Sequence, residues 1–145
     1  MFDKKFLVVD PGYKGGIERA SIYLYDYLID NGINSRYVSF KDQNDVPKNF
    51  SIIKKICDYF KPNFIFIHEY KNLELFAILK QIYPEIIMSY FSLPNPDHDI
   101  SDSYYSNKCL DFLISPAYKK ITDNKIPWSF NFPSRFFNAY SYGIS

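Results

Sequence analysis

The most chemically informative stretch of this sequence lies between its first apolar run and its first predicted helix. There, residues 10–19 read Asp-Pro-Gly-Tyr-Lys-Gly-Gly-Ile-Glu-Arg. Gly15 and Gly16 lack Cβ atoms, so backbone N–H groups at a helix start can approach a ligand closely, which favours phosphate or another anion. The alternative is that the two glycines only make a tight turn between a strand and a helix.

Two better-known phosphate-binding loops do not match this stretch. A P-loop would end in Gly-Lys-Ser or Gly-Lys-Thr, which is absent. The dinucleotide fingerprint GxGxxG is absent too, because the glycines stand at positions 12, 15 and 16. Without that fingerprint, Asp42 reads as a solvated loop residue and not as a ribose-binding acid. The stretch therefore indicates neither a P-loop nucleotidase nor a nicotinamide enzyme.

A second candidate group follows another apolar run, where His68 and Glu69 come directly after residues 64–67. A histidine titrates near neutral pH, so His68 could exchange a proton with a substrate or bind an acceptor hydroxyl. The alternative is a histidine whose ring is satisfied by a backbone carbonyl beside the next loop. Both interpretations stay open at this level.

A third cluster consists of Asp97, His98, Asp99 and Asp102 in a proline-containing segment. Its spacing matches no calcium-binding loop, and we expect no metal site. Such residues more often cap helices and solvate a loop, and this loop could also close over an acceptor. No Gly-x-Ser-x-Gly elbow is present, which argues against a serine hydrolase.

Composition restricts the function classes further. The 145 residues carry 17 Lys plus Arg against 16 Asp plus Glu, a formal net charge of +1. A general nucleic-acid binder needs a basic surplus, so we expect no nucleic-acid partner. Lys54-Lys55 and Lys119-Lys120 accordingly read as ordinary solvated helix faces.

The cysteines and the apolar runs point to a compartment. Cys57 and Cys109 belong to no CxxC or Cys/His pattern, so we expect two buried, reduced thiols. No apolar run reaches the length of a membrane span, and residues 1–9 are too short for a signal peptide. We therefore expect a soluble, cytoplasmic protein without an integral membrane segment.

The elements that must position these groups follow from hydrophobic periodicity. We expect strands at 6–9, 34–40, 64–67, 86–91, 111–115 and 128–132, and helices at 17–30, 51–60, 72–83 (capped by Asn72) and 117–123. This alternation predicts an α/β, Rossmann-like, doubly wound domain with a mainly parallel sheet and helices on both faces. Ligands of such sheets bind at the carboxyl ends of the strands, so the loops after the first, third and fourth strands deserve inspection.

We expect residues 1–133 to form this single domain and residues 134–145 to form an aromatic tail. The tail region is rich in phenyl and phenol rings, at Phe130, Phe132, Phe136, Phe137, Tyr140 and Tyr142. Either the tail folds back as a helix onto its own sheet, or these rings form an exposed apolar patch that faces a partner.

Several of these segments together resemble a known family. Gly-Gly-x-Glu-Arg at residues 15–19 resembles the first helix start in the amino-terminal domain of GT-B glycosyltransferases of the family 4 type. The resemblance continues in order through residues 31–33, 62–69 and 110–115, and Ile126-Pro127 stands near the family's crossing to a second domain. It covers nearly the whole chain, and its most specific part is Gly-Gly-x-Glu-Arg.

The resemblance implies transfer of a sugar from a UDP- or GDP-sugar donor, with retention of configuration and usually without a metal. In that family the amino-terminal domain mainly binds the acceptor, and a carboxy-terminal domain holds most of the nucleotide. It implies that Gly15 and Gly16 lie against the donor diphosphate and that His68 is a catalytic candidate on the acceptor side. The acceptor-binding residues expected on the same basis are Tyr13, Lys14, Glu69 and Ser92.

Two departures from the family pattern shape the functional expectation. Phe91 stands where the family commonly has a histidine that contacts the donor sugar, and a phenyl ring cannot supply that hydrogen bond. The sequence also stops where the donor-binding domain would begin. We therefore expect the acceptor-binding half of a glycosyltransferase, as a fragment or a split subunit, inactive alone and dependent on a second donor-binding domain or subunit. We expect no tightly bound cofactor.

Two other classes stay open. A stand-alone module could bind a glycan or nucleotide without turnover, as Phe91 and the absence of a second domain would allow. A small nucleotide-cofactor protein of flavodoxin-like shape is a third possibility.

Overall fold

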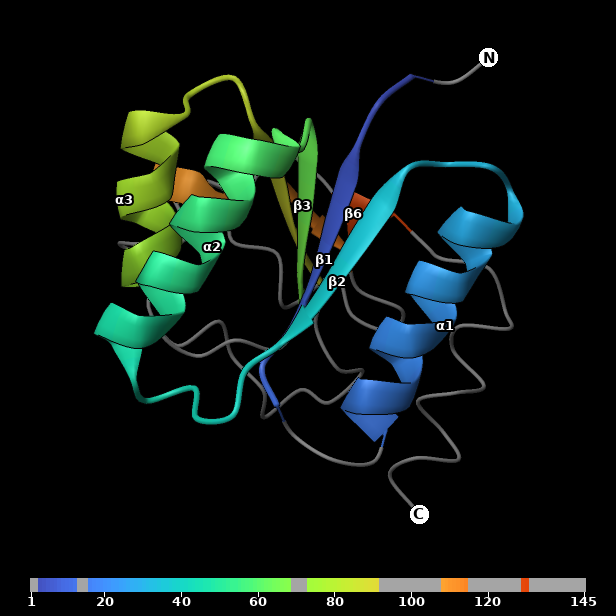
Figure 1. The fold of residues 1–145 in the computed structure, drawn as a ribbon, viewed down its shortest axis with the longest axis horizontal. Helices are drawn as coiled ribbons and strands as arrows, with labels where there is room; N and C mark the ends of the chain where they lie inside the picture. Colours follow the sequence, from blue (N-terminus) through green and yellow to red (C-terminus); the bar gives the residue numbers. More distant parts are fainter. Residues whose placement is uncertain (1–2, 13–15, 69–72, 92–107, 115–128, 131–145) are drawn as a thin grey trace.

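The computed structural model describes residues 3–12, 16–68, 73–91, 108–114 and 129–130, which build a single parallel sheet with helices on both faces (Figure 1). Within these ranges the strands are β1 (Phe6–Asp10), β2 (Ser35–Ser39), β3 (Phe64–His68), β4 (Ile87–Phe91), β5 (Phe112–Ile114) and β6 (Ser129–Phe130). They lie in the order β2-β1-β3-β4-β5-β6, and every neighbouring pair is parallel. The predicted α/β, Rossmann-like fold class is confirmed.

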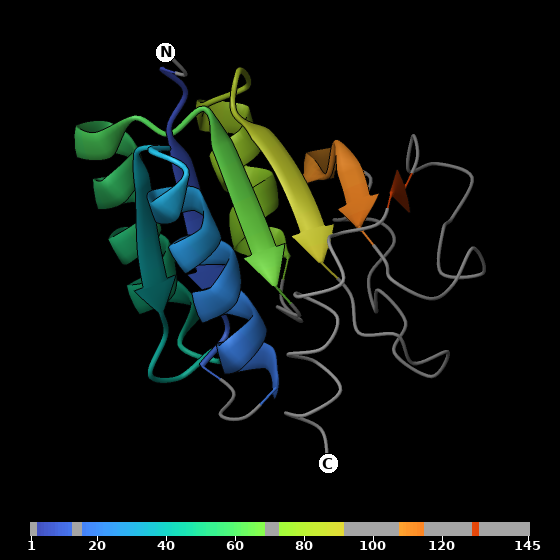
Figure 2. The ribbon, with the colours of Figure 1, turned by 90° about the vertical axis from the view of Figure 1, so that its right-hand side faces the viewer.

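Three longer helices pack on this sheet, namely α1 (Gly16–Asp30), α2 (Val46–Phe60) and α3 (Glu74–Ile82). Helix α1 covers one face over β1 and β2, whereas α2 and α3 contact each other on the opposite face (Figures 1 and 2). This arrangement follows from right-handed crossovers between parallel strands, which place successive helices according to the direction in which the chain moves along the sheet.

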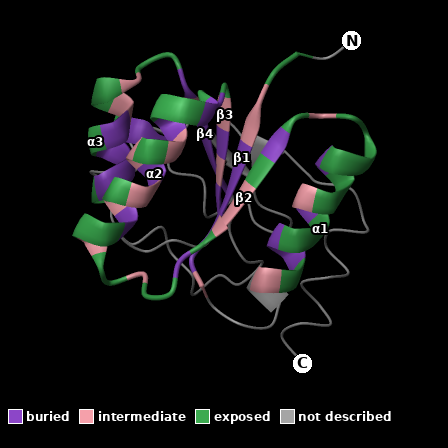
Figure 3. Ribbon diagram, in the orientation of Figure 1, coloured by how far each residue is buried: buried purple, intermediate pink, exposed green. Residues whose placement is uncertain are grey.

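Side chains of β1 alternate between two hydrophobic cores. Leu7 and Val9 belong to the larger core under α2 and α3, together with Ile65 and Ile67 of β3. Val8 belongs to the smaller core under α1. Figure 3 shows the buried residues concentrated on the strands and on the sheet-facing sides of the helices. The period of two along each strand sets this division, because successive side chains point to opposite faces.

The starts of α2 and α3 differ from the prediction. Helix α2 was expected from residue 51 but begins at Val46, because the Asp45 side chain accepts a hydrogen bond from the backbone N of Lys48 at 3.3 Å and caps the helix. Helix α3 begins one residue after Leu73, which occupies the N-cap position without a side-chain cap. The predicted cap, Asn72, lies outside the described residues.

The first strand is also longer than expected, since Asp10 belongs to β1 and is fully buried. Its backbone oxygen accepts a hydrogen bond from the N of Phe40 at 3.2 Å. Gly12 follows with a φ of 94°, a left-handed conformation that an L side chain rarely adopts. A Cβ at Gly12 would lie 2.0 Å from the backbone oxygen of Phe40, so only glycine fits here.

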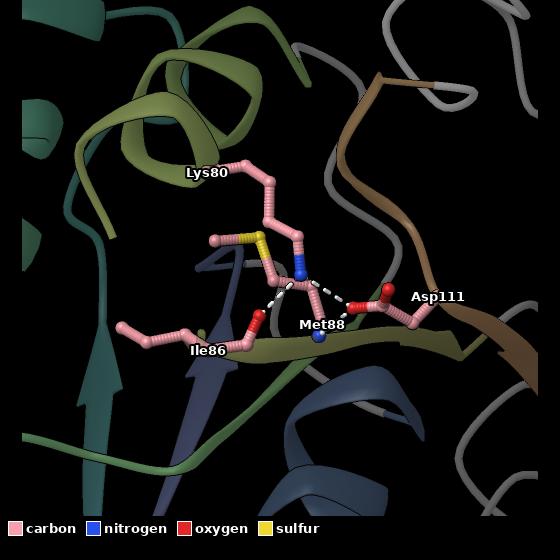
Figure 4. A network of polar contacts seen from close by, with 4 residues as sticks. All are labelled: Lys80, Ile86, Met88 and Asp111. Carbon is pink, nitrogen blue, oxygen red and sulfur yellow. Dashed lines mark hydrogen bonds and ion pairs between the residues drawn. The ribbon is translucent and has the colours of Figure 1, made fainter. Parts of the chain in front are cut away.

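A polar network joins β5 to β4 and α3 (Figure 4). The Nζ of Lys80 donates to Asp111 Oδ2 at 2.7 Å and also to the backbone oxygen of Ile86. Asp111 Oδ2 accepts a second bond from the backbone N of Met88 at 2.8 Å, and the Asp111 N donates to the Met88 oxygen at the same distance. The network therefore anchors the chain immediately before β5.

Cys57 and Cys109 are buried thiols that form no disulfide, as predicted. Among the described helices, none is long and apolar enough to cross a membrane. The predicted helix at 117–123 and the tail at 134–145 lie outside the described residues.

Candidate functional site

The strand order reverses between β1 and β3. The chain moves from β1 outward to β2, and then returns past β1 to place β3 on its other side. In doubly wound sheets, ligands bind outside the carboxyl ends of the strands at such a reversal. In this chain the carboxyl ends of β1 and β3 carry Asp10 and His68, and both lie in register next to each other, since Val9 pairs with Ile67.

The Asp10 carboxylate is held by hydrogen bonds from two sides. Oδ2 accepts from the hydroxyl of Tyr37 at 2.5 Å, and Oδ1 accepts from the backbone N of Gly12 at 2.9 Å. Burial raises the pKa of Asp10 above its ordinary value, and the bonds from Tyr37 and Gly12 partly offset this rise. The carboxylate therefore fixes the turn that leaves β1.

The His68 ring is bound to the first helix. Its Nδ1 lies 2.6 Å from the hydroxyl of Ser21, which is itself fully buried on α1. The ring is 3% exposed, and its Nε2 is buried as well. The Nδ1 atom thus contacts a side chain on α1. The two interpretations from the sequence had instead given the ring a ligand or a backbone carbonyl as its partner.

Burial lowers the pKa of His68 to about 3, so the ring is neutral throughout the neutral range. A general acid or base works best when its pKa lies near the operating pH. A neutral ring whose Nδ1 is held by Ser21 is better suited to presenting a fixed hydrogen-bonding atom than to exchanging protons. The catalytic role of His68 stays a prediction.

The first turn of α1 carries the carboxylate of Glu18 next to the cation of Arg19. Glu18, in the first turn of α1, raises the pKa of both Asp10 and Tyr37 through its charge, although burial is the larger cause for each. A carboxylate near the helix start opposes the binding of an anion there, whereas the positive end of the helix dipole favours it. These two effects act against each other at the predicted diphosphate position.

The structure places only some of the predicted site residues. Gly16 is the first residue of α1, and His68 ends β3. Phe91 ends β4 in register with His68, at the same edge of the sheet. The remaining predicted residues, Tyr13, Lys14, Gly15, Glu69 and Ser92, lie outside the described residues, as do the acidic cluster at 97–102 and its His98. Among the described residues, no group of His, Cys, Asp and Glu side chains is arranged to hold a metal ion.

Three residues of this site were not predicted as site residues from the sequence. In the sequence, Asp10 follows the predicted first strand and Tyr37 lies inside the predicted second strand, and neither they nor Ser21 were site candidates. A clue for Ser21 was present, because position 21 falls on the apolar stripe formed by Ala20, Leu24 and Leu28. A polar residue on a buried stripe needs a partner, and His68 supplies it. No comparable clue pairs Tyr37 with Asp10.

Comparisons with known proteins add little to this geometry. No protein-family model matches the chain, and no curated protein matches it. Among solved structures, the crystal structure of Clostridium botulinum phage c-st TubZ is similar at a TM-score of 0.49 with 12% sequence identity. The match covers 86% of this chain and 55% of the TubZ chain, so this chain spans about half of that protein. A likeness this distant carries no information about function.

Proposed function

We propose that this chain is the acceptor-binding half of a nucleotide-sugar-dependent glycosyltransferase, with its ligands at the carboxyl edge of β1 and β3. The observation that carries the proposal is the polar cluster at the strand-order reversal. There Asp10 holds the turn after β1, and Ser21 ties α1 to His68 at the end of β3. The end of β1 and helix α1 are therefore both anchored to the sheet, which is what a pre-organised ligand site requires.

The proposal includes weak binding of the donor by this chain alone. The dipole of α1 attracts a diphosphate at Gly16, but Glu18 and the buried Asp10 place negative charge near the same helix start. Tight donor binding then requires cationic groups from a second domain or subunit. The sugar acceptor would contact the edge formed by the ends of β3 and β4.

A second candidate function is a stand-alone module that binds a glycan or a nucleotide without turnover. The state of His68 favours it. The ring is neutral, buried and bound to Ser21, so His68 is poorly suited to proton transfer near neutral pH.

Isothermal titration of the full chain with UDP, GDP and their sugar conjugates tests these alternatives. The decisive variant is Gly16→Asp, because an acidic residue at a helix start is compatible with the helix and repels the diphosphate. Its matched control is Ser51→Asp, which adds the same charge at an exposed position of α2.

Binding near about 1 mM that is lost in Gly16→Asp and kept in Ser51→Asp supports the acceptor-binding half. Binding near about 1 μM with the same response to the variants supports the stand-alone module. Binding that responds equally to the two variants, or no binding of any of these ligands, contradicts a diphosphate site at the start of α1.

A further inference from the structure

A second candidate site lies at the opposite, amino edge of the sheet. A hollow of about 440 Å³ is lined by residues from the starts of β1 and β2 and from the last turns of α2. These segments lie at the end of the sheet where the chain enters β1 (Figure 1). This volume falls in the range of sites that bind small molecules. The residues that line it are Lys5, Asn34, Arg36, Lys55, Ile56, Tyr59 and Phe60.

Two of its cations are held by one aromatic ring. The Lys5 Nζ lies 5.6 Å from the centre of the Phe60 ring and donates to the Phe60 backbone oxygen at 3.2 Å. The Arg36 guanidinium lies 5.1 Å from the same centre. Such cation–π contacts fix the position of a charge but do not neutralise it. The two positive charges are therefore held together against their mutual repulsion.

A third cation, Lys55, completes the wall, and no carboxylate lines the hollow. Among the described residues, the ion pairs join Lys54 to Asp58 and Lys80 to Asp111, and neither pair includes a cation of the hollow. Three positive charges around one concave surface without an acidic residue favour an anion with several negative oxygens, such as a phosphate or diphosphate. The sequence alone had assigned Lys54 and Lys55 together to an ordinary solvated face.

The hollow also presents an exposed aromatic ring. Tyr59 is 83% exposed, which is unusual for a large aromatic residue on an otherwise packed helix. An exposed phenol ring next to phosphate-binding cations can stack on the face of a nucleobase. The Asn34 side chain, also exposed on this wall, offers amide donors and an acceptor to a base or a sugar.

We propose that this hollow binds a nucleoside phosphate. Lys5, Arg36 and Lys55 hold the phosphate groups, and Tyr59 stacks on the base. The site is separate from the carboxyl edge of β1 and β3, and it does not depend on the function proposed for that edge.

The test is a titration of the full ¹⁵N-labelled chain with ADP, with inorganic pyrophosphate and with adenosine, followed by NMR at low ionic strength, where the attraction of exposed cations is least screened. We expect ADP and pyrophosphate to shift the amide signals of residues 5, 34, 36, 55 and 59. Adenosine, which lacks the phosphates, should shift them only weakly.

Adjacent lysines provide a matched pair of variants. Lys55→Gln removes a cation of the hollow and should weaken ADP and pyrophosphate binding about tenfold. Lys54→Gln makes the same charge change next door, where the lysine is paired with Asp58, and should change binding by less than about twofold. Tyr59→Ser should weaken ADP binding about tenfold and leave pyrophosphate binding unchanged.

Three results would overturn the proposal. The first is no response of the hollow to ADP or pyrophosphate. The second is an equal loss of binding in Lys54→Gln and Lys55→Gln, which would indicate a general charge effect. The third is equal ADP binding in wild type and Tyr59→Ser, which would show that the base does not stack on Tyr59 and that the hollow does not recognise a nucleoside. The amide signals themselves separate the two sites, because binding at the carboxyl edge of β1 and β3 should not shift the signals of residues 5, 34, 36, 55 and 59.

Discussion

His68 and Ser21 are 47 residues apart in the sequence and meet in the interior between β3 and α1. Their hydrogen bond holds a neutral imidazole in a place from which water is excluded. A buried neutral histidine makes folding sensitive to acid, because the unfolded chain binds a proton that the folded chain does not bind. The pH dependence of stability therefore reports directly on this pair.

We expect the free energy of unfolding to fall as the pH drops below about 6.5, the ordinary pKa of histidine, and to keep falling towards the folded-state pKa of His68 of about 3. The contribution of His68 is absent above this window, because both states are then neutral. It amounts to about 2 kcal/mol between about pH 7 and about pH 5. Urea unfolding of wild type and of His68→Gln across this range measures it.

In His68→Gln this part of the acid sensitivity should disappear, since an amide does not titrate. The His98→Gln variant measures the share of the second histidine in the chain. Equal acid sensitivity in wild type and His68→Gln would show that the folded state accepts a proton on this ring.

At the scale of the elements, the turn after β1 requires glycine at position 12, because the backbone there is left-handed. Gly12 and Gly32 both have positive φ angles, of 94° and 72°, but they differ in their surroundings. A Cβ at Gly12 would collide with the backbone oxygen of Phe40, whereas a Cβ at Gly32 would meet nothing within 4 Å. The two glycines therefore separate the cost of the left-handed conformation from the cost of a collision.

We expect Gly32→Ala to lower the free energy of unfolding by about 1–2 kcal/mol, which is the cost of the left-handed conformation alone. Gly12→Ala should lower it by about 3 kcal/mol or more, because the collision adds to the same cost. Denaturant unfolding of both variants checks the difference. Equal values would mean that the turn after β1 moves away from β2 without cost.

The connection of β5 to the sheet depends on the network of Lys80 and Asp111. Lys80→Met removes the cation while it keeps much of the aliphatic chain, and it leaves Asp111 with one of its two hydrogen-bond donors. We expect a loss of about 1–3 kcal/mol in the free energy of unfolding and faster hydrogen exchange at the Met88 amide.

The matched control for this network is Lys54→Met. The pair of Lys54 and Asp58 is more exposed and lies within one helix, so its loss should cost clearly less than the loss of the Lys80 contacts. A loss in Lys80→Met no larger than in Lys54→Met would show that β5 is held by packing and not by this network.

At the scale of the whole molecule, the two faces of the sheet are packed unequally. The core under α2 and α3 contains most of the buried apolar side chains, including Cys57 and Cys109, while the core under α1 is smaller. The polar cluster of Asp10, Ser21 and His68 lies on the α1 side. The residues proposed to position ligands thus stand on the face with the smaller core.

The two thiols report on the larger core. Burial raises the pKa of Cys57 and of Cys109 to about 12, and each residue is 2% exposed. The thiolate is the reactive form, so we expect neither thiol to react with Ellman's reagent in the folded protein near pH 8. Both should react rapidly in urea. Rapid modification of either thiol without denaturant would show that this core opens readily.

The sequence by itself determined the sheet, the helices that alternate with its strands, and the reduced state of the two thiols. These features depend on local periodicity and composition, which are readable without knowledge of distant contacts. It also placed His68 at a strand end and Gly16 at a helix start. Helix starts were predicted less accurately. The hydrophobic pattern placed the start of the second helix at residue 51, whereas the Asp45 side chain caps the helix several residues earlier.

Only the tertiary structure decided which polar groups meet. The strand order brings Asp10 beside His68 and Tyr37 beside Asp10, and the packing of α1 delivers Ser21 to the His68 ring. The hollow at the amino edge likewise joins Lys5, β2 and the end of α2. Periodicity assigns each residue to a face of its own element, but the crossover connections and the register between strands determine which faces come together. The chemistry of both edges therefore depends on contacts that no local pattern encodes.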